Sequence, residues 1–82
     1  MREGWPRALP VADHAVLVEF GETIEDGIVA QVAALDRRLA ARPFPGFLEA
    51  VPAFASLMVV FDPMKADLDA IVAALDALRA AP

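Results

Sequence analysis

The stretch EAVPAFASLMVVFDP, from Glu49 to Pro63, holds the strongest strand signal in the chain and a proline ahead of it. Its second part, Ser56 to Phe61, is almost entirely apolar and rich in residues that favour strands. Pro52 removes a backbone N–H donor, so we expect the strand to stop there and Ala53–Ala55 to form a turn. Asp62-Pro63 then ends the second arm. The stretch is predicted to be a β-hairpin, although PAFA contains neither Asn-Gly nor Asp-Gly to fix the turn type.

Upstream of this hairpin, two further segments are predicted to be strands. AVLVEF, residues 15–20, alternates in a way that places Val16, Val18 and Phe20 on one face. WPRALPV, residues 5–11, contains two prolines and is therefore expected at the edge of a sheet. The first arm of the hairpin, FLEAV at 47–51, supplies the fourth strand.

Two amphipathic helices complete the pattern. The first begins near Thr23, which forms a weak capping box with Asp26, and it stops before Pro43. The second begins near Asp67, a favourable N-cap residue. Acidic residues at the first turn (Glu22 and Glu25) and basic residues at the last (Arg37, Arg38 and Arg42) suit the dipole of the first helix. Its apolar stripe comprises Ile24, Ile28, Val32, Leu35 and Leu39, and that of the second helix comprises Leu68, Ile71, Val72, Leu75 and Leu78.

The order strand, strand, helix, strand, strand, helix predicts an α+β fold. A strand–helix–strand crossover would place both helices on one face of a small, mostly antiparallel sheet, a ferredoxin-like arrangement. The nearly all-apolar strand 56–61 is expected to be buried on both faces. A ferredoxin-like fold usually has another strand after its second helix, so we expect a longer chain or a partner to complete this one. No internal repeat or linker is visible.

Composition narrows the classes of function. The chain has 82 residues, enough for one domain, a net charge of −5 and no cysteine. The acidic balance argues against nucleic acid and anionic membranes as partners, and nothing resembles a secretory signal, so we expect a cytoplasmic protein. Hydrophobic residues make up 59% of the chain, which favours an apolar surface that meets another domain or subunit over a core of short side chains alone.

Few residues suggest chemistry. There is no paired-carboxylate, phosphate-loop or metal-ligand pattern, and a lone His14 is more simply an exposed loop residue than a catalytic one. Ser56 and Asp62 are expected to serve turns. Glu49 is either a solvent-facing edge residue or half of an ion pair between subunits.

Aromatic residues offer a different candidate site. Phe44, Phe47 and Phe54 are either core residues or anchors for a partner, and Trp5 is either a strand-edge cap or a docking residue. The candidate interaction residues are therefore Trp5, Phe44, Phe47, Glu49, Pro52, Phe54, Ser56 and Asp62. No catalytic, cofactor-binding or metal-binding residue is predicted.

Two segments carry a family resemblance: HAVLVEFGETI, His14 to Ile24, and PFPGFLEAVPAFASLMVVFDP, Pro43 to Pro63. With the acidic start of each helix, they cover nearly the whole chain. The sequence resembles the N-terminal domain of the family that contains the 5-oxoprolinase B subunit, the KipI antikinase and the first of the allophanate hydrolase subunits. Relatives often have Tyr where this chain has Phe54 and a polar or basic residue where it has Ala55, so any polar role of that turn is reduced here.

The resemblance implies a part of a larger assembly. In this family the domain is the smaller part of a two-domain subunit, and the cyclophilin-like C-terminal domain lies outside these 82 residues. The subunit joins a second one, of the 5-oxoprolinase C-subunit or KipA type, in ATP-dependent opening of 5-oxoproline to glutamate or in related allophanate or urea amide hydrolysis. This domain would then associate, possess no chemistry of its own and bind no cofactor, with ATP belonging to the parent complex. Self-association, a regulatory module that inhibits a sensor histidine kinase, and a small domain of unrelated function stay open as alternatives.

Overall fold

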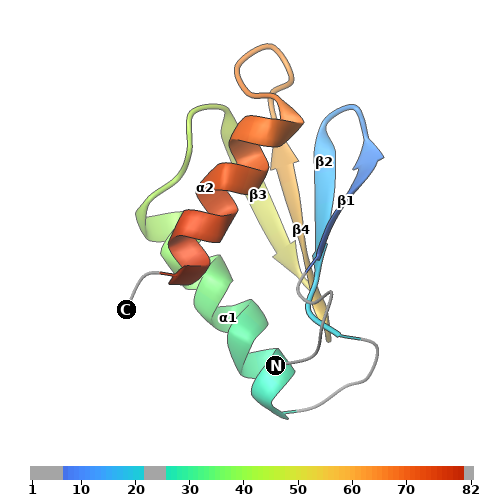
Figure 1. Cartoon of the computed structure of the whole chain (residues 1–82), viewed down its shortest axis with the longest axis vertical. Helices are drawn as coiled ribbons and strands as arrows, with labels where there is room; N and C mark the ends of the chain where they lie inside the picture. Colours follow the sequence, from blue (N-terminus) through green and yellow to red (C-terminus); the bar gives the residue numbers. More distant parts are fainter. Residues whose placement is uncertain (1–6, 22–25, 81–82) are drawn as a thin grey trace.

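The part of the chain that the structure describes forms four strands and two helices in the predicted order (Figure 1). The computed structural model describes residues 7–21 and 26–80, so the predictions for Trp5, Glu22, Thr23, Ile24 and Glu25 lie outside the described residues. Every other predicted element is present within a residue or two of its expected bounds. The elements are β1 (Arg7–Ala12), β2 (Ala15–Glu19), α1 (Asp26–Ala41), β3 (Phe47–Pro52), β4 (Ser56–Phe61) and α2 (Leu68–Ala80).

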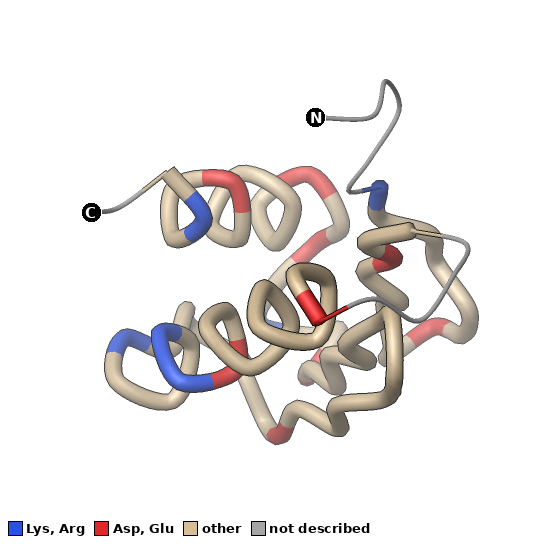
Figure 2. The backbone as a smooth tube through the Cα atoms, turned by 90° about the horizontal axis from the view of Figure 1, so that it is seen from below, with Lys and Arg blue, Asp and Glu red and all other residues tan. Residues whose placement is uncertain are grey.

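The strands form one sheet in the order β1-β2-β4-β3, and every neighbouring pair is antiparallel. β2 and β3 therefore run in the same direction with β4 between them, and α1 connects the two. Seen along the sheet, both helices lie on the same side of it (Figure 2). The α+β prediction, with two helices on one face, is confirmed. The chain passes through the unit strand, strand, helix twice, and the central contact between the two units is the β2–β4 pair.

The core lies between the sheet and the helices. Alternate residues of the two central strands point toward the helices, which bury their own apolar stripes against them. Fully burying one such side chain stabilises the fold by about 1.5–3 kcal/mol. The buried cluster comprises Val16, Val18, Phe20, Val32, Leu35, Leu39, Leu57, Val59, Phe61, Ile71 and Leu75.

Strand β4 differs from its prediction in one respect. Leu57, Val59 and Phe61 are buried, whereas Met58 and Val60 between them are only half-buried. The reason is that the sheet has a helical layer on one face only. An all-apolar strand therefore does not show that both of its faces are covered.

Side chains cap both ends of α2. The Asp67 carboxylate accepts a hydrogen bond from the Ala70 N–H at 2.8 Å, which confirms it as the N-cap. At the other end, the Arg38 guanidinium of α1 donates to the carbonyl oxygens of Leu78 at 3.1 Å and Arg79 at 3.4 Å. Arg38 lies in the last turn of α1, where its charge suits the helix dipole as predicted, and its guanidinium also satisfies C-terminal carbonyls of α2.

Two loops meet at one end of the sheet. The Asp62 N–H donates to the Gly46 carbonyl oxygen at 2.8 Å. Gly46 has a φ of 92°, and a Cβ added there would lie 3.0 Å from the Lys65 Cβ. The Asp62 carboxylate accepts from the Met64 N–H at 2.9 Å, and its carbonyl oxygen accepts from Lys65 and Ala66. The Pro-Gly and Asp-Pro motifs lie on either side of the hairpin in the chain, and their two loops are in direct contact. Glycine at position 46 permits this contact because it tolerates the positive φ and leaves room for the neighbouring loop.

Candidate interaction surface

The sheet has a second face that neither α1 nor α2 covers (Figures 1 and 2). On it, Leu9 pairs with Leu17, Leu17 with Met58, and Met58 with Val51, so one row of apolar side chains crosses all four strands. Val60 adjoins this row on β4. We call Leu9, Leu17, Val51, Met58 and Val60 the apolar face. Leu9 is 38% and Val51 43% exposed, and the other three are half-buried by their neighbours in the sheet.

Charged residues lie at two opposite corners of this face. Arg7 on β1 is opposite Glu19 on β2, and the Arg7 Nε lies 3.0 Å from the Glu19 Oε1. Glu49 lies on edge strand β3, opposite Val60, at the far end of the sheet. Glu49 is exposed and takes part in no ion pair with the residues at 7–21 and 26–80. The apolar face is thus bordered by one neutralised pair and one carboxylate.

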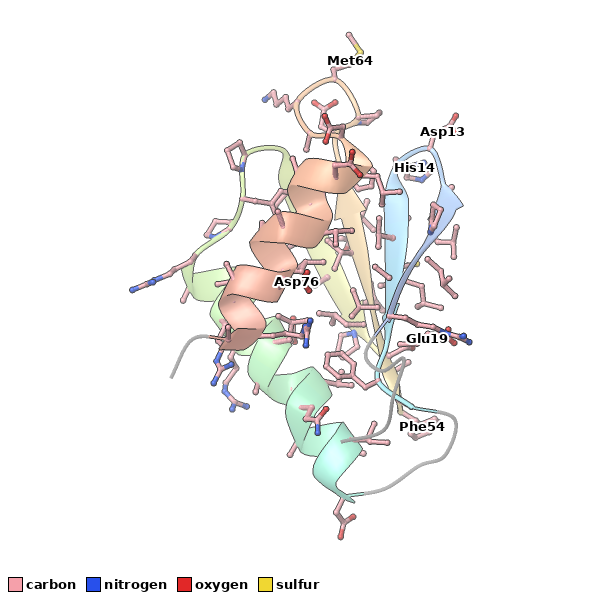
Figure 3. All side chains as sticks on the ribbon, in the orientation of Figure 1. Asp13, His14, Glu19, Phe54, Met64 and Asp76 are labelled. Atoms are coloured by element: carbon pink, nitrogen blue, oxygen red, sulfur yellow. The ribbon has the colours of Figure 1, made fainter. Side chains whose placement is uncertain are left out.

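Phe54 lies at the tip of the β3–β4 hairpin. The Ala53 N–H donates to the Ser56 carbonyl oxygen at 2.9 Å and closes the turn. The Phe54 side chain is 69% exposed and points away from the core at the end of the sheet remote from Asp13 and His14 (Figure 3). Phe54 is therefore exposed to solvent. Of the two roles predicted for it, this excludes a position in the core and leaves that of an anchor for a partner.

Phe44 and Phe47 occupy a different environment. Their rings make an edge-to-face contact with centroids 5.6 Å apart and planes at 67°. Both are half-buried and pack against the core cluster. These two phenylalanines close the core beneath the loop that precedes β3, which is the first of the two roles predicted for them.

The remaining candidate residues are scattered. Pro52 is exposed at the end of β3, and Ser56 is half-buried, with its carbonyl oxygen in the hairpin turn. Asp62 is engaged in the loop after β4, where its carboxylate accepts from the Met64 N–H and its own N–H donates to Gly46. His14 is exposed in the β1–β2 turn, and its carbonyl oxygen accepts from the Phe61 N–H at 2.9 Å. Among the predicted interaction residues that the structure describes, Glu49 and Ser56 border the apolar face, Glu49 beside Val60 and Ser56 two residues before Met58 on β4.

Sequence reasoning missed the members of the apolar face. The available signal was that β2 and β4 are apolar at both parities, so that each must show apolar side chains on the face away from the helices. A hollow of about 350 Å³ lies on the helical side of the sheet and is lined by Phe20, Leu35, Arg38 and Arg79 among others. Its two arginines already donate to α2 carbonyls and to Asp76.

Metal and membrane sites are not indicated in the part of the chain that the structure describes. No group of three or more His, Cys, Asp or Glu residues there is arranged to hold a metal ion. Neither of its helices is long and apolar enough to cross a bilayer.

Residues 6–82 match the family described as carboxyltransferase domain, subdomain C and D. The chain is 40% identical over 52 residues to the B subunit of 5-oxoprolinase from Bacillus subtilis, a match that covers 63% of this chain and 22% of the relative. A conserved uncharacterized protein from Pyrococcus horikoshii has a similar structure, with a TM-score of 0.81, 31% identity, and coverage of 90% of this chain and 34% of that one. The N-terminal domain of the histidine kinase inhibitor KipI from Bacillus subtilis is also similar in structure, with a TM-score of 0.59 and 38% identity. That match covers 68% of this chain and 55% of the KipI domain chain. The chain thus spans about a fifth of the curated relative.

Proposed function

Because the chain belongs to the family of carboxyltransferase domains, subdomain C and D, we propose that it is an association domain of a protein like the 5-oxoprolinase B subunit. One observation carries this proposal: within residues 7–21 and 26–80, both helices lie on the other side of the sheet (Figure 2) and leave the apolar face uncovered across all four strands. Contiguous exposed apolar surface on a small domain marks a place where another protein binds. On this proposal the domain contributes surface and positioning, and the chemistry takes place elsewhere in the assembly.

The parent assembly that we propose joins this protein to a second subunit of the 5-oxoprolinase C-subunit or KipA type. Together they would open 5-oxoproline to glutamate at the expense of ATP, in the cytoplasm, with ATP bound outside this domain. The support is the 40% identity to one of the subunits of 5-oxoprolinase. Related allophanate or urea amide chemistry is a variant of the same proposal.

The test is reconstitution. The protein and the C-type subunit encoded in the same genome are purified separately and mixed with 5-oxoproline and ATP, and glutamate is measured. We expect glutamate from the mixture, none from the 82-residue chain alone, and a complex of the two proteins by native mass spectrometry. Hydrolysis by the 82-residue chain alone, or the lack of any complex, would contradict the proposal.

A second candidate function is inhibition of a sensor histidine kinase. The observation that favours it is the 38% identity to the N-terminal domain of KipI. Here the purified parent protein should suppress autophosphorylation of a sensor kinase from the same cells while producing no glutamate from 5-oxoproline. Undiminished autophosphorylation at a several-fold excess of the protein would count against it.

A further inference from the structure

The charges around the apolar face indicate what kind of surface covers it. Of the residues in the four strands, Arg7, Glu19 and Glu49 are the charged ones, and Arg7 is the single basic residue. Arg7 and Glu19 neutralise each other at 3.0 Å. Glu49 has no cation of the sheet within reach, since it lies on the edge strand farthest from Arg7.

Covering the face has a cost at Glu49. A carboxylate removed from water without a cation loses several kcal/mol of solvation free energy. A surface that covers Val60 and Val51 also approaches Glu49, which lies on the same face of β3. A surface that covers this corner therefore keeps its apolar contacts with Val60 and Val51 at the lowest cost when it provides a positive charge for Glu49.

A second copy of the chain fits this requirement poorly. Sheets that stack face to face usually keep their strands within about 30° of each other. Arg7 and Glu49 lie at diagonally opposite corners of the face. In a two-fold stack of that kind, Glu49 of one copy is therefore opposite uncharged residues of the other, either alanines or Ser56, and not opposite Arg7. Only an orthogonal stack would bring Arg7 to Glu49, and Arg7 would then be shared with Glu19. Two chains of net charge −5 also repel each other.

We infer that the apolar face binds a different protein whose contact surface is apolar at its centre and places a Lys or Arg side chain against Glu49. Met58 and Leu17 form the centre of the contact, and the Arg7–Glu19 pair forms its rim. The inference rests on the proposed function, under which this partner is the second subunit of the assembly. It adds to that function the surface used and the charge required.

The test measures the dissociation constant between the protein at its natural length and the C-type subunit of the same genome by isothermal titration calorimetry. Met58→Glu places a charge at the centre of the face, and Glu49→Lys reverses the charge at its corner. Met64→Glu is the matched control, because Met64 is 91% exposed and lies in the loop after β4, off the face (Figure 3). Circular dichroism and thermal unfolding verify that each variant is folded.

We expect Met58→Glu to weaken binding about 100-fold or more, Glu49→Lys about 10-fold or more, and Met64→Glu by less than about 2-fold, since like charges at a contact oppose association. If either of the first two binds as tightly as Met64→Glu, the inference is overturned while the proposed function stands. A dimer of this chain that Met58→Glu dissociates would overturn it as well, because the occupant would then be a second copy. Failure of the unaltered proteins to bind each other would remove the proposed function and the inference together.

Discussion

Arg38 offers the most direct test of how the two helices are held together. Its guanidinium is half-buried and donates from α1 to the last carbonyls of α2, at 3.1 Å to Leu78 and 3.4 Å to Arg79. Arg38→Met keeps much of the apolar stem but removes the donors and the charge. A hydrogen bond to a charged group stabilises a protein by about 1.5–3 kcal/mol. Because the second bond is long and Arg38 is partly exposed, we expect the substitution to lower the free energy of unfolding by about 1–2 kcal/mol.

The length of the chain allows this loss of stability to be expressed as a change in Tm. At about 2.1 cal/mol/K per residue, unfolding 82 residues has an entropy of roughly 170 cal/mol/K, so each kcal/mol lowers Tm by about 6 °C. We therefore expect Arg38→Met to lower Tm by about 6–12 °C in a thermal scan followed by circular dichroism. The Tm of Arg38→Lys should lie between that of the unaltered protein and that of Arg38→Met, because lysine keeps the charge but lacks the planar guanidinium.

The matched control is Arg37→Met on the same turn of α1. Arg37 is exposed, so its replacement should change stability by less than about 0.5 kcal/mol, or about 3 °C. Equal Tm values for Arg38→Met and Arg37→Met would refute the reasoning, since the cross-helix bonds would then contribute nothing measurable. The loss at Arg38 should also persist in about 0.5 M NaCl, because partly buried charges are screened less than exposed ones.

Five other substitutions, which make three separate tests, probe the fold by urea denaturation. Gly46→Ala should lower the free energy of unfolding by about 2 kcal/mol or more, because Gly46 has a φ of 92° and the neighbouring loop crowds the new Cβ. Gly27→Ala should raise it by up to about 1 kcal/mol, because Gly27 is an exposed helical site with nothing within 4 Å of the new Cβ. A loss of stability at both glycines would contradict this expectation. Leu57→Ala, at a fully buried position, should cost about 3–5 kcal/mol, and Met58→Ala on the open face clearly less. Asp67→Ala should cost about 1 kcal/mol by removing the N-cap of α2, and no change in the urea midpoint would mean that this bond is not needed.

Local sequence signals account for most of the fold. The hairpin at 47–61 follows from Pro52 and the apolar run after it, and the helices follow from stripes at spacings of three and four. The cap of α2 by Arg38 could not be predicted, because 40 residues separate the guanidinium from the Leu78 carbonyl. The periodicity of one helix gives no information on where the end of another will lie.

The candidate site was predicted less completely than the fold. The exposed position of Phe54 depends on how the hairpin turn is placed relative to the helical layer, which no local pattern encodes. An apolar surface was expected, but the members of the apolar face were not predicted, because an all-apolar strand such as β4 is compatible with one covering layer or two. That choice depends on how many helices the chain supplies, and two helices cover only one face of this sheet.

The passage of the chain twice through strand, strand, helix affects how the domain reaches its native state. Each hairpin can form locally, but the Val16–Val59 and Val18–Leu57 pairs that join them connect positions about 40 residues apart. Neither half, 7–41 nor 47–80, possesses a complete core, since β2 packs beside β4 and α1 packs against β3 and β4 as well as α2. We therefore expect folding to be a single cooperative event, with a rate set by the search that brings the two halves together. A chain cut in the segment 42–46 would regain its structure only by reassociation of both fragments.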